Sequence, residues 1–230
     1  MNLHGFGDQL LAGTLLTLQL AFASLGVGLA LGMAGALAKT SRNAAARWAG
    51  STYTTVVRGV PELLVVLLVY FGASQVLTML AELVGIDAYV EIDAFTAGTI
   101  ALGLTFGAYA TEVLRGALQT VPHGHVEAAQ ALGMGSGRIF IRIVMPQAWR
   151  VALPGLGNLF LVLLKDTALI SVIGLEELMR KSAIAVSHTK EPFTFYMAAA
   201  LIYLGLTVAA MTGLALLEKR AARGFARRTA

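Results

Sequence analysis

The chain has 230 residues, of which 57% are hydrophobic and 13% are charged. Soluble domains have about 45–50% apolar and about 25% charged residues, so this composition predicts a polytopic membrane protein without a separate soluble enzyme domain. The net charge of +4 does not indicate nucleic-acid binding, because the basic residues gather in short segments between apolar stretches, where they encode membrane orientation. The absence of cysteine excludes disulfides and thiolate metal sites.

In chain order, apolar stretches predict a single all-α membrane domain over residues 1–230. A bilayer core takes about 20 apolar residues per helix. Five such spans are expected, near residues 9–38, 60–84, 95–118, 152–175 and 193–217. Small residues four apart allow close helix packing within or between subunits. They occur at Gly28 and Gly32, at Gly103 and Gly107, and at Gly205, Ala209 and Gly213.

The charges between the spans predict the orientation of the chain. The first span is followed by four basic residues: Lys39, Arg42, Arg47 and Arg58. The second is followed only by acidic ones: Asp87, Glu91 and Asp93. Between the third and fourth spans basic residues again outnumber acidic ones, with Arg138, Arg142 and Arg150 against Glu127. Because basic segments favour the cytoplasmic side, we expect the N-terminus outside and the C-terminus in the cytoplasm.

The polar segment between the third and fourth spans, residues 119–149, predicts a compact cytoplasmic knob. Val126–Leu132 favours a short helix, and Gly133 suits the left-handed position that ends one. A second short helix is expected over Arg138–Met145, with Pro146 ending it. Small side chains on a rigid knob fit a groove on another protein, although an ordinary solvated loop has the same local pattern.

This segment resembles the "EAA" loop of the membrane subunits of binding-protein-dependent ABC importers. The family motif is matched at Glu127, Ala128, Ala129, Gly133, Ile143 and Pro146, with Met145 in place of the usual leucine. The stretches "VVRGVPELLVVLLVYFG" and "ALPGLGNLFLVLLKDTALISVIGLEEL" are similar to permeases of the polar amino-acid branch. Within that branch the similarity is greatest to permeases for arginine, histidine, lysine and ornithine, and opine permeases are close relatives.

The resemblance implies a type I permease in a bacterial cytoplasmic (inner) membrane, surrounded by lipid. Its implied partners are a second permease, either a copy or a paralogue, two ATPase subunits and a soluble amino-acid-binding protein. The EAA loop would be the coupling helix that seats in a cleft of the ATPase. No cofactor is expected in this chain, and ATP-Mg would bind the ATPase, because the sequence has no G-x-x-x-x-G-K-[ST] phosphate loop. We therefore expect a transporter subunit that is not itself an enzyme.

Charged residues within the predicted spans are candidates for the substrate path. Each costs about 2.5–3.5 kcal/mol at the bilayer centre, so each should face protein or a watery path. Spacing favours ion pairs of Glu62 with Arg58 and of Glu112 with Arg115. Lys165 and Asp166 point about 100° apart on a helix and cannot pair well. The candidates, with two weaker polar ones last, are Asp166, Lys165, Glu62, Glu112, Thr167 and Asn158.

Two other classes of membrane protein have less support. A proton-coupled secondary transporter would use Glu112 and Asp166 as a relay, but the internal repeats expected of such carriers are absent from the sequence. An intramembrane enzyme would need a nucleophile with its base, or a metal site, and neither pattern is visible. The histidines are too scattered to form a ligand set: His4, His123, His125 and His188.

Overall fold

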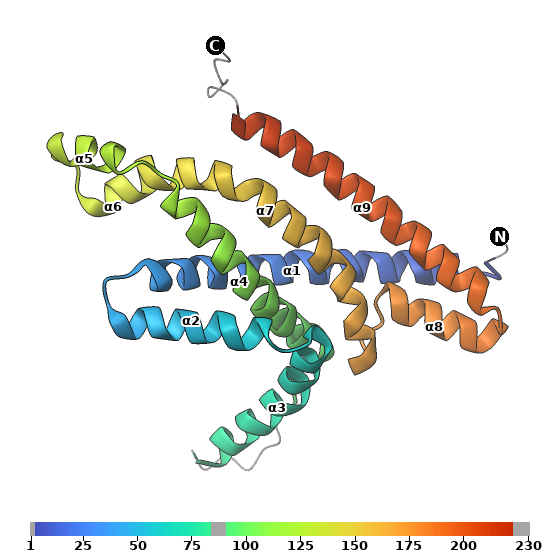
Figure 1. Ribbon diagram of the computed structural model, residues 1–230. Helices are drawn as coiled ribbons and strands as arrows, with labels where there is room; N and C mark the ends of the chain where they lie inside the picture. Colours follow the sequence, from blue (N-terminus) through green and yellow to red (C-terminus); the bar gives the residue numbers. More distant parts are fainter. Residues whose placement is uncertain (1–2, 84–90, 223–230) are drawn as a thin grey trace.

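The computed structural model describes residues 3–83 and 91–222, and every regular element in these ranges is helical (Figure 1). The α-helices are α1 (Gly7–Thr40), α2 (Ala44–Arg58), α3 (Glu62–Leu83), α4 (Ala94–Gln119), α5 (His123–Ala131), α6 (Ser136–Ile139), α7 (Met145–Asp166), α8 (Leu178–Thr189) and α9 (Pro192–Ala222). A π-helical segment, η1 (Phe140–Val144), precedes α7, and a 3₁₀ helix, η2 (Thr167–Ile173), follows it. Asp87 and the predicted end of the second span at residue 84 lie outside the described residues.

Five helical segments of the described chain are long and apolar enough to cross a membrane, as the sequence predicts. They cover Gly7–Thr40, Glu62–Met79, Ala94–Gln119, Ser136–Ile173 and Pro192–Ala221. The fourth segment starts 16 residues before the predicted residue 152, because α6, η1 and α7 follow one another without a loop. The all-α fold with five spans is therefore confirmed.

Pro146 does not end the second knob helix, and that prediction was wrong. Pro146 lies in the first turn of α7, where the missing backbone N–H of proline costs no helical hydrogen bond. Immediately before it, the backbone N–H of Met145 donates to the carbonyl of Phe140, five residues back. This wider π turn shifts the hydrogen-bond ladder just before the proline, so the helix continues into the fourth span.

A helix that the sequence analysis missed, α2, lies beside α1 and contacts α4 (Figure 1). The hydroxyl of Tyr53 on α2 donates to the carbonyl oxygen of Leu104 in α4 at 2.8 Å. With 15 residues, α2 is about 22 Å long, so Arg58 at its end is far from the α1–α2 turn. The sequence analysis grouped Arg58 with the basic residues that follow the first span. The structure instead places Arg58 at the far end of α2.

The core is organised around a close contact between α1 and α4. A Cβ atom at Gly28 would lie 2.5 Å from Cδ1 of Phe106, and one at Gly103 would lie 2.7 Å from Cγ1 of Val27. Only glycine lets the two backbones approach so closely. Four residues form this contact, which we call the glycine seam: Gly28, Gly32, Gly103 and Gly107. The predicted packing role of these glycines is thus realised inside the subunit.

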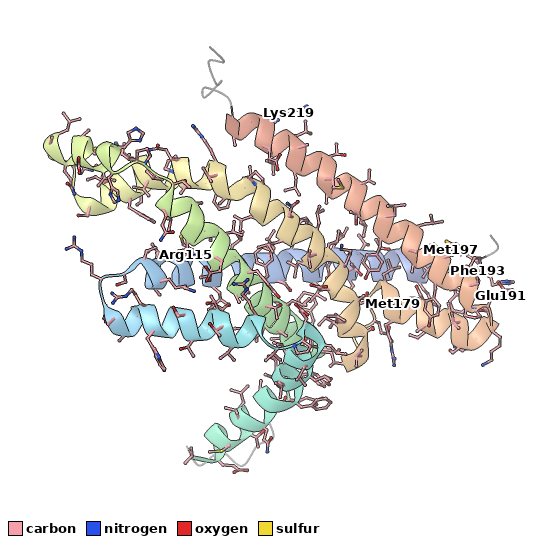
Figure 2. The ribbon with its side chains drawn as sticks, viewed as in Figure 1. Arg115, Met179, Glu191, Phe193, Met197 and Lys219 are labelled. Atoms are coloured by element: carbon pink, nitrogen blue, oxygen red, sulfur yellow. The ribbon has the colours of Figure 1, made fainter. Side chains whose placement is uncertain are left out.

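Helix α9 packs differently along its length. Its first turns pack with α1 and α8 in a small apolar cluster around Phe195. In contrast, no residue of its most hydrophobic 18-residue stretch is buried in the described chain. Phe193 and Met197 mark the packed end and Lys219 the opposite end (Figure 2). A Cβ atom at Gly205 or Gly213 would meet nothing within 4 Å, so these two glycines make no close helix contact in the described chain.

Glu177 fastens the packed end of α9 to its neighbours. Its side chain is fully buried and caps α8 by accepting hydrogen bonds from the backbone N–H groups of Met179 and Arg180, both at 2.9 Å. It also accepts hydrogen bonds from the hydroxyls of Tyr203 on α9, at 3.2 Å, and Thr17 on α1, at 3.4 Å. One carboxyl group therefore connects three helices, two of which span the membrane.

Candidate functional site

Three helices enclose a cavity of about 180 Å³ that contains two acidic side chains. Glu62 reaches it from the start of α3, Tyr109 from α4, and Asp166 from the end of α7. Apolar side chains and Thr105 complete its lining. Of the sequence-predicted path residues, the structure brings Glu62 and Asp166 together here.

Two helix breaks place these carboxyl groups. Gly59, Val60 and Pro61 separate α2 from α3, so Glu62 occupies the first turn of α3, where a negative charge is favourable. Asp166 is the last residue of α7 before the backbone tightens into the 3₁₀ helix η2. The 3₁₀ helix forms the end of this spanning segment, a position where such tighter turns are common, and Gly174 ends it in the left-handed conformation. Both acidic groups therefore sit where a spanning segment changes direction or pitch.

The expected ion pair between Arg58 and Glu62 is not among those of the described residues, because the break after Arg58 removes the helical i,i+4 geometry. Both residues contact Tyr109 instead. The hydroxyl of Tyr109 donates to Oε1 of Glu62 at 3.3 Å, and the guanidinium of Arg58 lies 5.1 Å from the ring centroid. Tyr109, which the sequence analysis missed, thus connects the cavity to α2.

The other polar candidates on the fourth span do not line this cavity. Lys165 lies on a different side of α7, in a hollow shared with Tyr196 and Tyr203. This separation agrees with the angle expected for adjacent helical residues. Thr167 is fully buried, and its hydroxyl donates to the carbonyl of Leu164. Asn158 is exposed on the helix surface.

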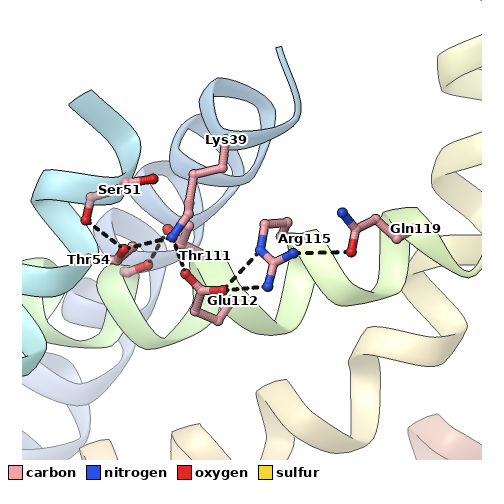
Figure 3. Close-up of polar contacts among 8 residues, drawn as sticks. Lys39, Ser51, Thr54, Thr111, Glu112, Arg115 and Gln119 are labelled. Carbon is pink, nitrogen blue, oxygen red and sulfur yellow. Dashed lines mark hydrogen bonds and ion pairs between the residues drawn. The ribbon is translucent and has the colours of Figure 1, made fainter. Parts of the chain in front are cut away.

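Glu112 belongs to an ion network and not to the cavity (Figure 3). One carboxylate oxygen, Oε1, accepts a hydrogen bond from the ammonium of Lys39 on α1, and the other, Oε2, lies 2.9 Å from the guanidinium of Arg115. The predicted pair with Arg115 is therefore present. Lys39 also donates to Thr54 of α2 at 2.9 Å. The network fixes α1, α2 and α4 to one another.

The knob ends its first helix as the sequence predicts. The backbone N–H of Met134 donates to the carbonyl of Ala129, and that of Gly133 donates to Gln130. This pair of hydrogen bonds is a Schellman motif, which needs a left-handed residue, and Gly133 supplies it with φ = 75°. Glu127, Ala128 and Gly133 are exposed, so they form a surface that another protein can contact.

Ala129 and Ile143 of the motif, together with neighbouring residues, hold the knob together. Ala129 and Ile139 are buried where α5 meets α6, with 4% and 3% of their surface exposed. Nδ1 of His125 on α5 lies 2.9 Å from the side-chain carbonyl of Gln147, whose amide donates to the carbonyl of Ile143. This chain of contacts ties the knob to the start of α7. The knob and the start of α7 are therefore joined by side-chain contacts as well as by the continuous helix.

Comparison with known proteins decides the family. Residues 26–223 match the family described as "Binding-protein-dependent transport system inner membrane component". The chain belongs to this family. It is accordingly a membrane permease subunit of an inner membrane transport system, and it is not an enzyme, as the sequence predicted.

Individual relatives place the permease more narrowly. It is 45% identical to the octopine transport system permease protein OccQ of Rhizobium radiobacter, over 97% of this chain and 94% of the relative. It is 43% identical to the histidine/lysine/arginine/ornithine transport system permease protein HisQ of Salmonella typhimurium, over 98% of both chains. A solved structure described as an amino acid ABC transporter with histidines superposes with a TM-score of 0.77 at 36% identity, covering 93% of this chain and 94% of that one. The type I importer permease fold is thereby shown.

Proposed function

We propose that this permease is one of two membrane subunits of an ATP-driven importer for amino acids with cationic side chains. Two ATPase subunits and a soluble binding protein complete the proposed assembly, with ATP-Mg bound by the ATPases. The observation that carries the substrate class is the acidic cavity, in which Glu62 and Asp166 face a common space within the spans. The relatives named for octopine and for histidine, lysine, arginine and ornithine support the same class.

The charge of the cavity favours a cation. A carboxylate inside a membrane span is costly, by up to about 2.5–3.5 kcal/mol at the bilayer centre, so two in one cavity favour a positive partner. Arg58 is directed to the face of Tyr109, and Lys165 lies in a separate hollow. None of the ion pairs among the described residues involves Glu62 or Asp166, and a substrate ammonium or guanidinium is the direct partner that we propose for them.

The size of the cavity limits what it holds. Ligand pockets generally have about 300–1,000 Å³, and this one has about 180 Å³. It therefore takes the cationic end of a substrate and leaves the α-amino and α-carboxyl groups outside. The sister permease and the opening of the spans supply the remaining space in the proposed transport cycle.

The knob is the proposed site of ATPase coupling. Its exposed face, Glu127, Ala128 and Gly133, seats in the ATPase cleft, while the buried Ala129 supports that face and the carbonyl of Ile143 holds Gln147 at the start of α7. Closure of the ATPase dimer moves the knob, and α7 follows because no loop separates the two. The break before Glu62 and the 3₁₀ helix after Asp166 serve as hinges, so the same motion that alternates access also reshapes the cavity.

An opine importer is the second candidate within this class, because the relative OccQ is named for octopine. A proton-coupled carrier is less well supported. Glu112 is held between Lys39 and Arg115, and it does not share the cavity of Asp166, so the two acids do not form a relay.

Uptake into vesicles containing the complete importer tests the proposal. Asp166→Asn and Glu62→Gln should each lower arginine and lysine uptake at least tenfold, because truncating a buried charge contact costs roughly 2–5 kcal/mol. Lys165→Gln is the matched control on the neighbouring residue and should retain uptake. Competition by octopine then separates an opine importer from one for amino acids. Normal arginine uptake by Asp166→Asn would remove the carboxylate from the path.

A further inference from the structure

A second hollow of the described chain, with none of its lining residues shared with the acidic cavity, has an entirely different character. It is a groove of about 350 Å³ between α1, α7 and α9, and its lining residues are all apolar. We refer to it as the apolar groove. Phe22 of α1 and Phe160 of α7 approach each other at one end, with ring centroids 5.6 Å apart, and Trp149 and Leu217 lie at the other end.

The groove exists because α9 leaves the bundle. Eight residues before its end, α9 meets α7 at Gly157, where an added Cβ atom would lie 3.0 Å from Cδ2 of Leu214. The absence of a side chain at residue 157 lets the end of the Leu214 side chain pack against the α7 backbone. On the side facing α1, Gly213 leaves open space. From Trp149 to Phe160 the groove follows 11 residues of α7, which is about 16 Å of helix.

Positive charge gathers at the Trp149 end. Arg150 follows Trp149 in the chain, and Lys219 and Arg220 follow Leu217 on the last turns of α9, against one acid, Glu218. Figure 2 shows Lys219 at this end of α9, opposite the packed end at Phe193. Tryptophan is enriched where a spanning helix reaches the headgroup layer, so the basic end of the groove belongs at the membrane surface.

We propose that the apolar groove binds an anionic phospholipid, with an acyl chain between α1, α7 and α9 and the headgroup at the basic end. Basic pockets between spanning helices are suited to anionic headgroups, and each nearby cation attracts them by about 1 kcal/mol. A helix is a poorer occupant. A helix has a diameter of about 10–12 Å, so one lying over the groove would place only side chains in it and leave the basic end without an anionic partner.

The groove can be filled without disturbing the fold. Gly213→Leu places a side chain in the groove, where a Cβ atom meets nothing within 4 Å, and it replaces a poor helix former by a good one. Gly205→Leu is the matched control, because it makes the same change on the same helix, also in open space, at a residue that does not line the groove. The double variant Lys219→Gln with Arg220→Gln removes headgroup attraction and leaves the groove open.

The test uses the complete importer, reconstituted with phosphatidylglycerol or with phosphatidylcholine of the same acyl chains. Native mass spectrometry then counts the lipids retained by each complex. The wild type and Gly205→Leu should retain phosphatidylglycerol in preference, and Gly213→Leu should retain at least tenfold less. The double variant should lose the preference for phosphatidylglycerol by about fivefold per cation removed.

Three results would overturn the proposal. Equal lipid retention by Gly213→Leu and Gly205→Leu would place the lipid elsewhere. Equal retention of the two lipids by the wild type would exclude headgroup recognition. Loss of one permease from the Gly213→Leu complex would assign the groove to the contact between subunits. None of these measurements depends on which substrate the importer carries.

Discussion

Lys39, near the end of α1, donates a hydrogen bond to Glu112 in α4, although 73 residues separate the two in the chain (Figure 3). The side chain of Lys39 is 16% exposed and that of Glu112 is 23% exposed, so water screens the pair only weakly. Arg115 contacts the same carboxylate, and the three charges together bind the ends of α1 and α2 to the helix that leads into the knob.

Removing Glu112 should destabilise the permease more than removing either of its partners. Glu112→Gln leaves two cations facing each other, and we expect a loss of about 1–3 kcal/mol, whereas Lys39→Met leaves Glu112 paired with Arg115. Arg115→Gln, at a more exposed site, should be mildest. Thermal unfolding of the purified single and double variants gives the Lys39–Glu112 coupling energy, expected at about 0.5 kcal/mol or more. Purely additive effects would argue against a working pair.

Substitutions at Gly133 separate the backbone requirement of the knob from its surface. Asparagine tolerates the left-handed conformation, so Gly133→Asn should retain most transport. Gly133→Asp adds charge at the proposed docking face, so it should abolish stimulation of the ATPase by loaded binding protein. Gly135→Asp adds the same charge where φ is an ordinary −69°. ATPase stimulation and the amount of ATPase retained by the complex are the measurements. Full stimulation in Gly133→Asp would mean that this loop does not couple.

Tyr109→Phe should weaken substrate binding without abolishing transport. The variant loses the 3.3 Å hydrogen bond to Glu62 but keeps the ring that Arg58 contacts. A hydrogen bond of this length to a carboxylate is worth about 1 kcal/mol, which corresponds to a roughly fivefold increase in the KM for arginine uptake. Tyr109→Leu removes the ring as well and should be more severe. Identical KM values for both variants and the wild type would exclude Tyr109 from the site.

The proposed orientation is open to a direct chemical test, because the natural sequence contains no cysteine. Ser187→Cys, at an exposed residue of α8, should react with an impermeant thiol reagent added outside the cell. Ser136→Cys, at the start of α6 in the knob, should react only after the membrane is opened. The opposite labelling pattern would reverse the topology and would place the knob where no ATPase can reach it.

Glu177 should make stability depend on pH. Burial is the main influence on this carboxyl group and raises its pKa above the usual value near 4.5, although four hydrogen-bond donors oppose the shift. Because the pKa of Glu177 is higher in the folded than in the unfolded protein, its protonated form stabilises the folded state. This contribution to the free energy of unfolding is complete below pH 4.5 and is lost as the pH rises through the folded-state pKa. The melting temperature of the wild type should therefore fall as the pH rises from 4.5 through the folded-state pKa of Glu177. The melting temperature of Glu177→Gln should not fall over this pH range. Parallel curves would mean that Glu177 does not titrate there.

Local chemistry made much of this fold predictable. Apolar stretches give the five spans, and Gly133 ends its helix because a left-handed turn is a property of a few consecutive residues. The pair between Glu112 and Arg115 also follows from spacing on one helix. Lys39 was not assigned to the same network, because nothing in the sequence indicates which distant helix end will lie beside α4.

The predictions that were wrong, and the contacts that were not predicted, have equally specific causes. The sequence "RGVP" contains the glycine and proline that end α2 and begin α3, and that signal, read as a break, would have separated Arg58 from Glu62. Pro146 was read as a stop because proline usually ends a helix, but a π turn accommodates it here. The contact of Tyr109 with Glu62 depends on how α3 crosses α4, which no local pattern specifies.

The glycine seam has a further consequence for a cell that stores energy as an ion gradient. A water molecule needs about 30 Å³, and where Gly28 meets Phe106 there is not room even for a methyl group. Protons travel through membrane proteins along files of water, so the α1–α4 contact is closed to them in every state in which it persists. The insulation of this side of the permease therefore comes from glycine backbone packed directly against side chains such as Phe106 and Val27, and it lasts as long as that contact does.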